Sequence, residues 1–141
     1  VTTWTSVRIV DDEPALRDLM ARWAVSLGLE PTTAGSSEEA LERLRSRPHD
    51  LAVIDIVMPG HNGLWLVEEL RRSHPKSRVI FLCDGADQGK LIDAFCHGAS
   101  GYLETNDREA FLAKAIHAVS HGEAWVPHHF VTKIVERLAR S

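Results

Sequence analysis

The chain has 141 residues, of which 44% are hydrophobic, so it has the size and apolar content of one ordinary globular domain. Its 20 acidic and 16 basic residues give a formal net charge of -4, and no dense run of Lys or Arg indicates a nucleic-acid surface in this segment. Because the sequence has no apolar stretch of about 20 residues and no signal-peptide pattern, we expect a cytoplasmic protein that does not enter the membrane.

Short β-type runs alternate with helical patterns in the first part of the chain. Residues 7–10 form a run that predicts a first strand, and the helical pattern that follows ends at Gly28. The predicted inner face of this helix, at helical spacing, consists of Leu16, Leu19, Met20, Trp23, Ala24 and Leu27. Residues 30–34 predict a weaker strand at a sheet edge, because Pro31 cannot donate to a hydrogen-bond ladder.

The same alternation continues through the rest of the chain. Ser36 followed by Glu39 is a capping box that opens a second helix. The next predicted elements are a strand at 51–54, a helix near 63–73, a strand at 79–83, a helix near 87–97 and a strand at 101–103. A capping box at Asn106 and Glu109 opens another helix, whose predicted inner residues are Phe111, Leu112, Ala115, Ile116 and Val119. Five β/α units predict an α/β, flavodoxin-like (βα)5 fold with a doubly wound parallel sheet in the order 2-1-3-4-5.

Acidic residues directly follow two of these strands. Asp11 and Asp12 follow the first strand, and Asp55 follows the third. In the predicted order these two strands are neighbours at the point where the winding direction reverses, which is where ligands bind in open α/β sheets. At about 4 Å and an effective dielectric near 20, each pair of carboxylates repels by about 4 kcal/mol. The cluster therefore favours a bound cation or a shared proton, and we expect Mg²⁺.

Three motifs lie in order along the chain. They are Val-Asp-Asp-Glu-Pro at 10–14, Asp-Ile-Val-Met-Pro-Gly at 55–60 and Gly-Ala-Ser-Gly-Tyr-Leu at 98–103. Together they resemble the receiver domain of two-component response regulators, and the resemblance covers roughly residues 6–122. It implies a signalling domain rather than an enzyme. Such a domain takes a phosphoryl group from a sensor histidine kinase or a phosphotransfer protein and then switches its protein contacts.

The same resemblance assigns roles to single residues. It implies that Asp55 is the phosphoacceptor. It further implies that Mg²⁺ is bound by Asp12, Asp55 and the backbone carbonyl of Val57, with Asp11 acting through water. Tyr102 corresponds to the aromatic switch residue of receivers.

Two positions depart from the receiver pattern. Receivers usually have Thr or Ser where this chain has Cys83, and Lys where it has Thr105. A thiol is a poor hydrogen-bond donor and Thr carries no charge, so both contacts to a phosphoryl group would be weakened. Lys90 or Arg108 is a hypothetical substitute for the missing cation. The alternative function is a degenerate receiver that acts as an interaction module without stable phosphorylation.

Other interpretations of these residues are weaker. Asp12 would be an ordinary helix cap if the acidic motif served only to start a helix. An Asp-based phosphatase normally has a second Asp two residues after its nucleophile, where this chain has Val57. The spacing of Cys83 and Cys96 does not match a zinc site or a disulfide framework. His117 and His121 lack the accompanying ligands that a metal site needs.

The last part of the chain, residues 123–141, is expected to be a linker or helix outside the receiver domain. Its apolar stripe at helical spacing consists of Phe130, Val131, Ile134, Val135 and Leu138. The stripe could pack on its own domain, form a homodimer through residues 127–141, or begin a linker. The segment is loosely similar to the linker of transcription regulators that carry a helix-turn-helix domain. Any DNA contact would then come from residues beyond Ser141.

Overall fold

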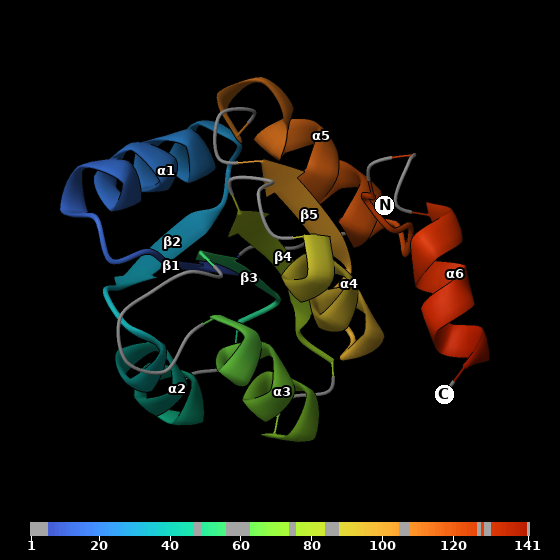
Figure 1. Ribbon diagram of the computed structural model, residues 1–141. Helices are drawn as coiled ribbons and strands as arrows, with labels where there is room; N and C mark the ends of the chain where they lie inside the picture. The colour runs from blue at the N-terminus through green and yellow to red at the C-terminus, as the bar shows by residue number, and fades with distance from the viewer. Residues whose placement is uncertain are drawn as a thin grey trace.

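A parallel sheet of five strands lies at the centre of the structure, a computed structural model that describes residues 6–46, 49–55, 63–73, 76–83, 88–104, 108–126, 128 and 131–140 (Figure 1). The strands are β1 (Ser6–Val10), β2 (Glu30–Ala34), β3 (Leu51–Asp55), β4 (Arg78–Cys83) and β5 (Gly101–Glu104). Their order is β2-β1-β3-β4-β5, and all neighbouring strands are parallel. The predicted flavodoxin-like fold is therefore confirmed, and β2 lies at an edge, as Pro31 indicated.

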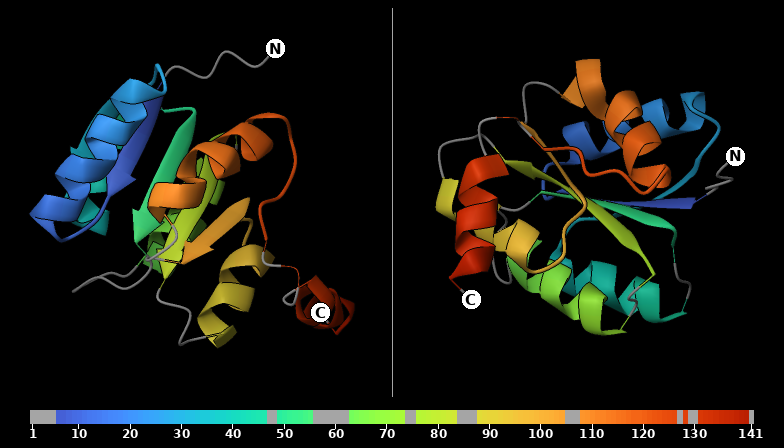
Figure 2. Two further views of the ribbon diagram at one scale, coloured as in Figure 1. Left: turned by 90° about the horizontal axis from the view of Figure 1, so that it is seen from above. Right: turned by 90° about the vertical axis from the view of Figure 1, so that its right-hand side faces the viewer.

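Helices cover both faces of the sheet. α1 (Pro14–Ser26) and α5 (Arg108–Ser120) lie on one face, whereas α2 (Ser37–Ser46), α3 (Gly63–Ser73) and α4 (Gln88–Cys96) lie on the other (Figure 2). A hydrophobic core lies on each face of the sheet, and successive strand residues point to opposite cores. On β4, Leu82 packs on the α1–α5 side, whereas Phe81 and Cys83 pack on the α2–α4 side. Among the helices that the structure describes, none has the length and apolar character needed to cross a membrane.

The predicted helix signals act largely as expected. The backbone N–H of Glu39 donates to Ser36 Oγ at 3.1 Å, which confirms the capping box of α2. Gly28 has a φ of 81°, a left-handed conformation that glycine adopts without strain, and it follows the end of α1. Asn106 lies outside the described residues.

Two predicted core positions are wrong. Leu27 is 43% exposed because it forms the C-cap of α1, where the chain has already left the helical face. Phe111 is 38% exposed. The inward face of α5 is set by Leu112 and the residues that follow it at helical spacing, so Phe111 lies to one side of that face. Its ring instead lies 6.3 Å from the ring of Trp125, centroid to centroid.

The helix α6 (Val131–Ala139) lies beside α4 (Figures 1 and 2). Ile134 packs against the core on the α2–α4 side, and Arg137 forms an ion pair with Asp93 of α4. The predicted apolar stripe is therefore divided. Part of it packs on the domain itself, whereas Val131, Val135 and Leu138 are exposed by 45%, 59% and 54%. Phe130 lies outside the described part of the chain.

Candidate functional site

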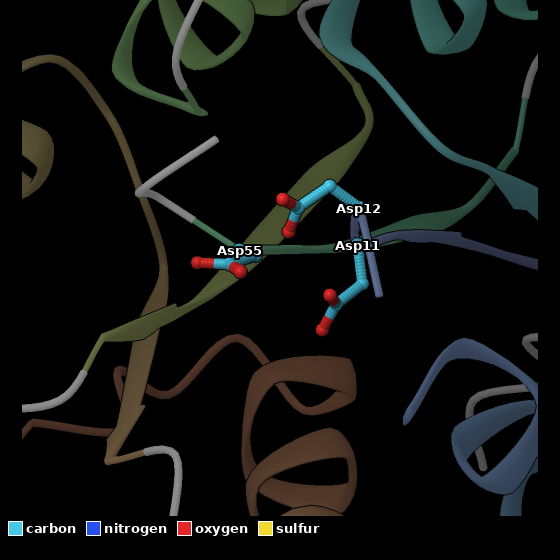
Figure 3. A group of neighbouring side chains, drawn as sticks. All are labelled: Asp11, Asp12 and Asp55. Atoms are coloured by element: carbon cyan, nitrogen blue, oxygen red, sulfur yellow. The ribbon is translucent and has the colours of Figure 1, made fainter. Parts of the chain in front are cut away.

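The parallel register brings the carboxyl ends of β1 and β3 together. Val10 lies opposite Ile54, so the residues that follow them are adjacent across the two strands. Oxygen atoms of Asp11, Asp12 and Asp55 all lie within 4.8 Å of one another. Figure 3 shows the three side chains where these two strand ends adjoin. The prediction that these three acidic residues converge is therefore confirmed.

The three aspartates differ in exposure and in how they are held. Asp11 is buried, Asp55 is half-buried and Asp12 is exposed. Asp11 Oδ1 accepts a hydrogen bond from the backbone N–H of Glu13 at 2.9 Å, and the Asp11 backbone N–H donates to Ala34 O at 3.1 Å. The turn between β1 and α1 is thereby fixed in a form that leaves Asp12 facing solvent.

The helix-cap interpretation of Asp12 is wrong. The N-cap of α1 is Glu13, and no side-chain hydrogen bond caps this end of the helix. Pro14 occupies the first turn of α1. The N–H groups of this turn have no acceptor within the helix, so the absence of an N–H in proline costs no helical hydrogen bond. Because Asp12 does not cap the helix, its carboxylate is available to a ligand at the end of the sheet.

Arg17 supports the same turn, and sequence reasoning did not identify it. Its Nη1 donates to the backbone oxygen of Asp11 at 2.8 Å. A Cβ added at Gly35 would lie 2.8 Å from this Nη1, so glycine leaves room for the guanidinium. The sequence signal is slight, because Arg17 is only one of several charged residues on α1. The contact gives a cation beside the acidic cluster and holds the main chain of Asp11.

The donor set fits a hard divalent cation. Mg²⁺ prefers octahedral oxygen ligands at about 2.1 Å, which places neighbouring and opposite ligands about 3 to 4 Å apart. The 4.8 Å limit on the three carboxylate oxygens is close to this spacing. A small closure of the side chains, or a bridging water, would complete the fit. A cation would also relieve the mutual repulsion of the three carboxylates.

Only some of the other predicted site residues lie within the described part of the chain. Cys83 and Tyr102 are both buried, on the α2–α4 side of β4 and β5, and the ring of Tyr102 lies 5.5 Å from that of Phe81. Cys83 is the last residue of β4, as predicted. Val57 and Thr105 lie outside the described residues, as do the side chains of Lys90 and Arg108.

A second polar group is buried at the opposite end of the sheet. Arg8 and His49 are 2% and 4% exposed, and Arg8 Nη2 lies 3.5 Å from His49 Nδ1. Thr32 Oγ1 lies 2.7 Å from His49 Nε2. One sign of this group is visible in the sequence, namely the charged Arg8 within the apolar run of β1. The group links β1, β2 and the start of β3, which indicates a structural role.

Among the described residues, the other histidines and cysteines do not form a second group of potential metal ligands. The rings of His117 and His121 lie 4.3 Å apart on the exposed side of α5. Within the described ranges, Asp11, Asp12 and Asp55 form the one group of three or more His, Cys, Asp or Glu side chains that could bind a metal ion together. Cys83 and Cys96 are not joined in a disulfide.

Comparison with known proteins gives one consistent family. Residues 7–117 match the model of the response regulator receiver domain. The chain is 34% identical over 116 residues to the DNA-binding transcriptional regulator NtrC of Escherichia coli strain K12, which covers 82% of this chain and 25% of NtrC. It is 30% identical over 130 residues to the transcriptional activator protein ExaE of Pseudomonas putida, covering 91% of this chain and 61% of ExaE. The chain thus spans only part of each of these relatives.

Solved structures show the same fold. A LuxR-family two-component response regulator from Aurantimonas matches with a TM-score of 0.84 and 24% identity, over 97% of this chain and 99% of that one. The isolated REC domain of RcsB from Salmonella enterica, solved with the phosphomimetic BeF3-, matches with a TM-score of 0.81 and 19% identity, over 94% and 99%. With the family model covering most of the chain, the identification follows: this chain belongs to the response regulator receiver family and is a receiver domain of two-component signal transduction.

Proposed function

We propose that Asp55 is the phosphoacceptor of this receiver and that its phosphorylation controls protein contacts. The observation that carries the proposal is the convergence of Asp11, Asp12 and Asp55 oxygens within 4.8 Å at the ends of β1 and β3. Asp55 is half-buried, so one side of its carboxylate is accessible to a donor. An acid at the end of an otherwise buried strand needs a partner or a ligand, and here the neighbouring acids favour a cationic one.

The proposed reaction is a phosphoryl transfer from a phosphohistidine of a histidine kinase or phosphotransfer protein. An oxygen of Asp55 forms a bond to phosphorus, the P–N bond breaks, and its electron pair remains on the imidazole, which takes up a proton. Bound Mg²⁺ would neutralise part of the negative charge on the transferred group. We propose Asp11, Asp12, Asp55 and the Val57 carbonyl as its ligands, with Arg17 holding the Asp11 main chain in place.

The switch elements of this receiver are proposed to be Cys83 and Tyr102. Both lie on the side of the sheet that α4 covers, and Tyr102 packs on Phe81 of β4. Phosphorylation adds a charge of about -1.5 to -2 at pH 7, which can shift the equilibrium between two arrangements of this region. Thr105 leaves the usual lysine position without a cation, so we expect the phosphorylated form to be short-lived compared with that of typical receivers.

The domain boundaries and the output are also proposals. We assign residues 6–122 to the receiver and residues 123–141 to a C-terminal helix or linker. NtrC is described as a DNA-binding transcriptional regulator and is matched over only 25% of its length. A DNA-binding output domain in the same polypeptide, and a role in transcription regulation, fit that partial coverage.

Intact-mass analysis tests the proposed function. The protein is incubated with a small acyl phosphate in Mg²⁺ or in EDTA, and the site of any adduct is mapped on proteolytic peptides. We expect one phosphoryl group, formed with Mg²⁺ and located on the peptide that contains Asp55. An adduct elsewhere would contradict the assignment. Bound Mg²⁺ without any adduct would favour the degenerate receiver, in which Cys83 and Thr105 no longer support phosphorylation.

We further propose that α6 forms a homodimer contact. Its outward residues Val131, Val135 and Leu138 follow one another at intervals of four and three, the spacing of a two-stranded coiled-coil seam, and all are exposed. Sedimentation analysis should show a concentration-dependent dimer. Combined replacement of Val135 and Leu138 by Glu is expected to weaken the dimer by at least about tenfold, because each change exposes a charge to the apolar contact.

Thr132→Glu is the matched control for the dimer, since it adds a charge to the same helix away from the apolar stripe. The control protein is expected to dimerise like the wild type. A wild-type protein that sediments as a monomer at all accessible concentrations would contradict the homodimer.

A further inference from the structure

The segment after α5 contacts two elements, β5 and α4, and β5 pairs with β4, the strand next to Asp55. Residues 123–126 and 131–139 are called the C-terminal strap here. On β5, the backbone N–H of Tyr102 donates to Trp125 O at 2.8 Å, and the N–H of Trp125 donates to Ser100 O at 3.0 Å. These bonds add a parallel bridge to the edge of the sheet, so the strap is attached to the main chain of β5.

Trp125 is held in place by close packing as well as by its backbone hydrogen bonds. A Cβ added at Gly101 would lie 3.3 Å from the Cβ of Trp125, so glycine permits the two main chains to approach. The indole packs partly buried against the α1–α5 core, and its ring lies 6.3 Å from that of Phe111. This end of the strap is therefore fixed by backbone bonds and by side-chain packing together.

The other end of the strap lies on α4. Arg137 Nη2 and Asp93 Oδ1 are 2.5 Å apart, and Ile134 packs against the core on the same side of the sheet. Figure 1 and both views of Figure 2 show α6 alongside α4. Exposed ion pairs contribute little on their own, so this end is the weaker of the two attachments. The strap thus ties α4 to β5, with its breakable contact on α4.

β4 links both tied elements to the acidic site, because it lies between β3 and β5 and leads into α4. Leu82 of β4 lies opposite Asp55, and Tyr102 packs on Phe81 of the same strand. α4 follows β4, so its N-terminal end lies toward the carboxyl ends of the strands. Negative charge added at Asp55 would attract that end, which carries partial positive charge. A strap fixed to β5 resists any movement of α4 that this attraction causes.

We propose that the C-terminal strap is an autoinhibitory latch, and that phosphorylation of Asp55 and release of α6 from α4 favour each other. The inference rests on the proposed function. Coupling of two equilibria is reciprocal, so a change that frees α6 must also favour the phosphorylated protein. Release of α6 would uncover the surface of α4 around Asp93 and leave Trp125 attached to β5.

Hydrogen exchange of the full chain, measured by mass spectrometry, tests the latch. Asp93→Arg and Arg137→Asp each place like charges in contact and are expected to speed exchange of residues 131–139 by about two- to fivefold. The double variant restores an ion pair of opposite polarity and should return exchange toward the wild-type rate. Arg140→Asp makes the same change of charge at the residue directly after α6 and should leave exchange unchanged. Single variants that exchange like the wild type would overturn the latch.

A second arm tests the coupling to phosphorylation. After treatment with a small acyl phosphate and Mg²⁺, the modified wild type is expected to exchange faster in residues 131–139, whereas Asp55→Asn should not respond. At steady state with the same donor, the ratio of phosphorylated to unmodified protein should be about two- to fivefold higher for Arg137→Asp than for the wild type, and the double charge swap should match the wild type. An adduct with unaltered α6 exchange would overturn the coupling. If no adduct forms, the proposed function fails, and the charge-swap arm alone decides the latch.

Discussion

Replacement of Asp55 by Asn is expected to abolish phosphorylation completely. A carboxamide has nearly the shape of the carboxylate but carries no anionic oxygen that can bond to phosphorus. The wild type, treated with a small acyl phosphate and Mg²⁺, should gain one phosphoryl mass, and the variant should gain none. The Asn variant also removes one of three repelling charges, so without Mg²⁺ its free energy of unfolding should be unchanged or higher by about 1 kcal/mol.

Asp50→Asn is the matched control, because Asp50 precedes the same strand at the opposite end of the sheet. Its Oδ2 lies 3.4 Å from the backbone nitrogen and from the Oγ of Ser6, and an amide oxygen can still accept these contacts. The control is expected to take up a phosphoryl group like the wild type. Adduct formation by Asp55→Asn would place the acceptor on another residue.

Phe81→Ala is expected to be the most destabilising single change in β4. Phe81 is fully buried, and its ring lies 5.4 Å from that of Phe95 and 5.5 Å from that of Tyr102. Loss of a buried Phe side chain together with the cavity left behind costs about 3 to 5 kcal/mol. Because domains of this size have a free energy of unfolding of about 5 to 15 kcal/mol, urea denaturation should show a large fall in the midpoint.

The comparison variant is Phe111→Ala, which removes the same ring from a position that is 38% exposed. Its expected cost is about 1 kcal/mol, because less apolar surface leaves water and the loss falls mainly on the contact with Trp125. If the two variants lost similar stability, the core around Phe81 would have to close around the missing ring.

The strand order and the acidic cluster could be predicted because both depend on local patterns. Apolar runs that end in Asp11 and Asp55 indicate where strands stop, and the order 2-1-3-4-5 then makes the two ends neighbours. Contacts between distant side chains leave no such pattern. The bond from Arg17 to the Asp11 main chain depends on the angle of α1 over the sheet and on the space that Gly35 leaves.

The C-terminal helix also shows what the sequence could not predict, which is the packing partner of its apolar face. Helical spacing of Ile134, Val135 and Leu138 predicted an amphipathic helix, but periodicity gives a face and not its partner. The packing of Ile134 on the domain follows from the turn after α5, where Gly122 adopts a φ of 82° and Trp125 returns to β5. The predicted inward position of Phe111 is wrong for a related reason, since its ring contacts Trp125 rather than the sheet.

The bridge between Gly101 and Trp125 also bears on how the protein behaves at high concentration. An edge strand with free N–H and C=O groups is a template on which another chain can add, and this is a common start of aggregation. At β5 the chain's own Trp125 takes up the N–H of Tyr102 and the C=O of Ser100. At the opposite edge, Pro31 removes a donor from β2. Both borders of the sheet are thus poor templates for intermolecular strand addition, which favours a protein that stays dispersed when abundant.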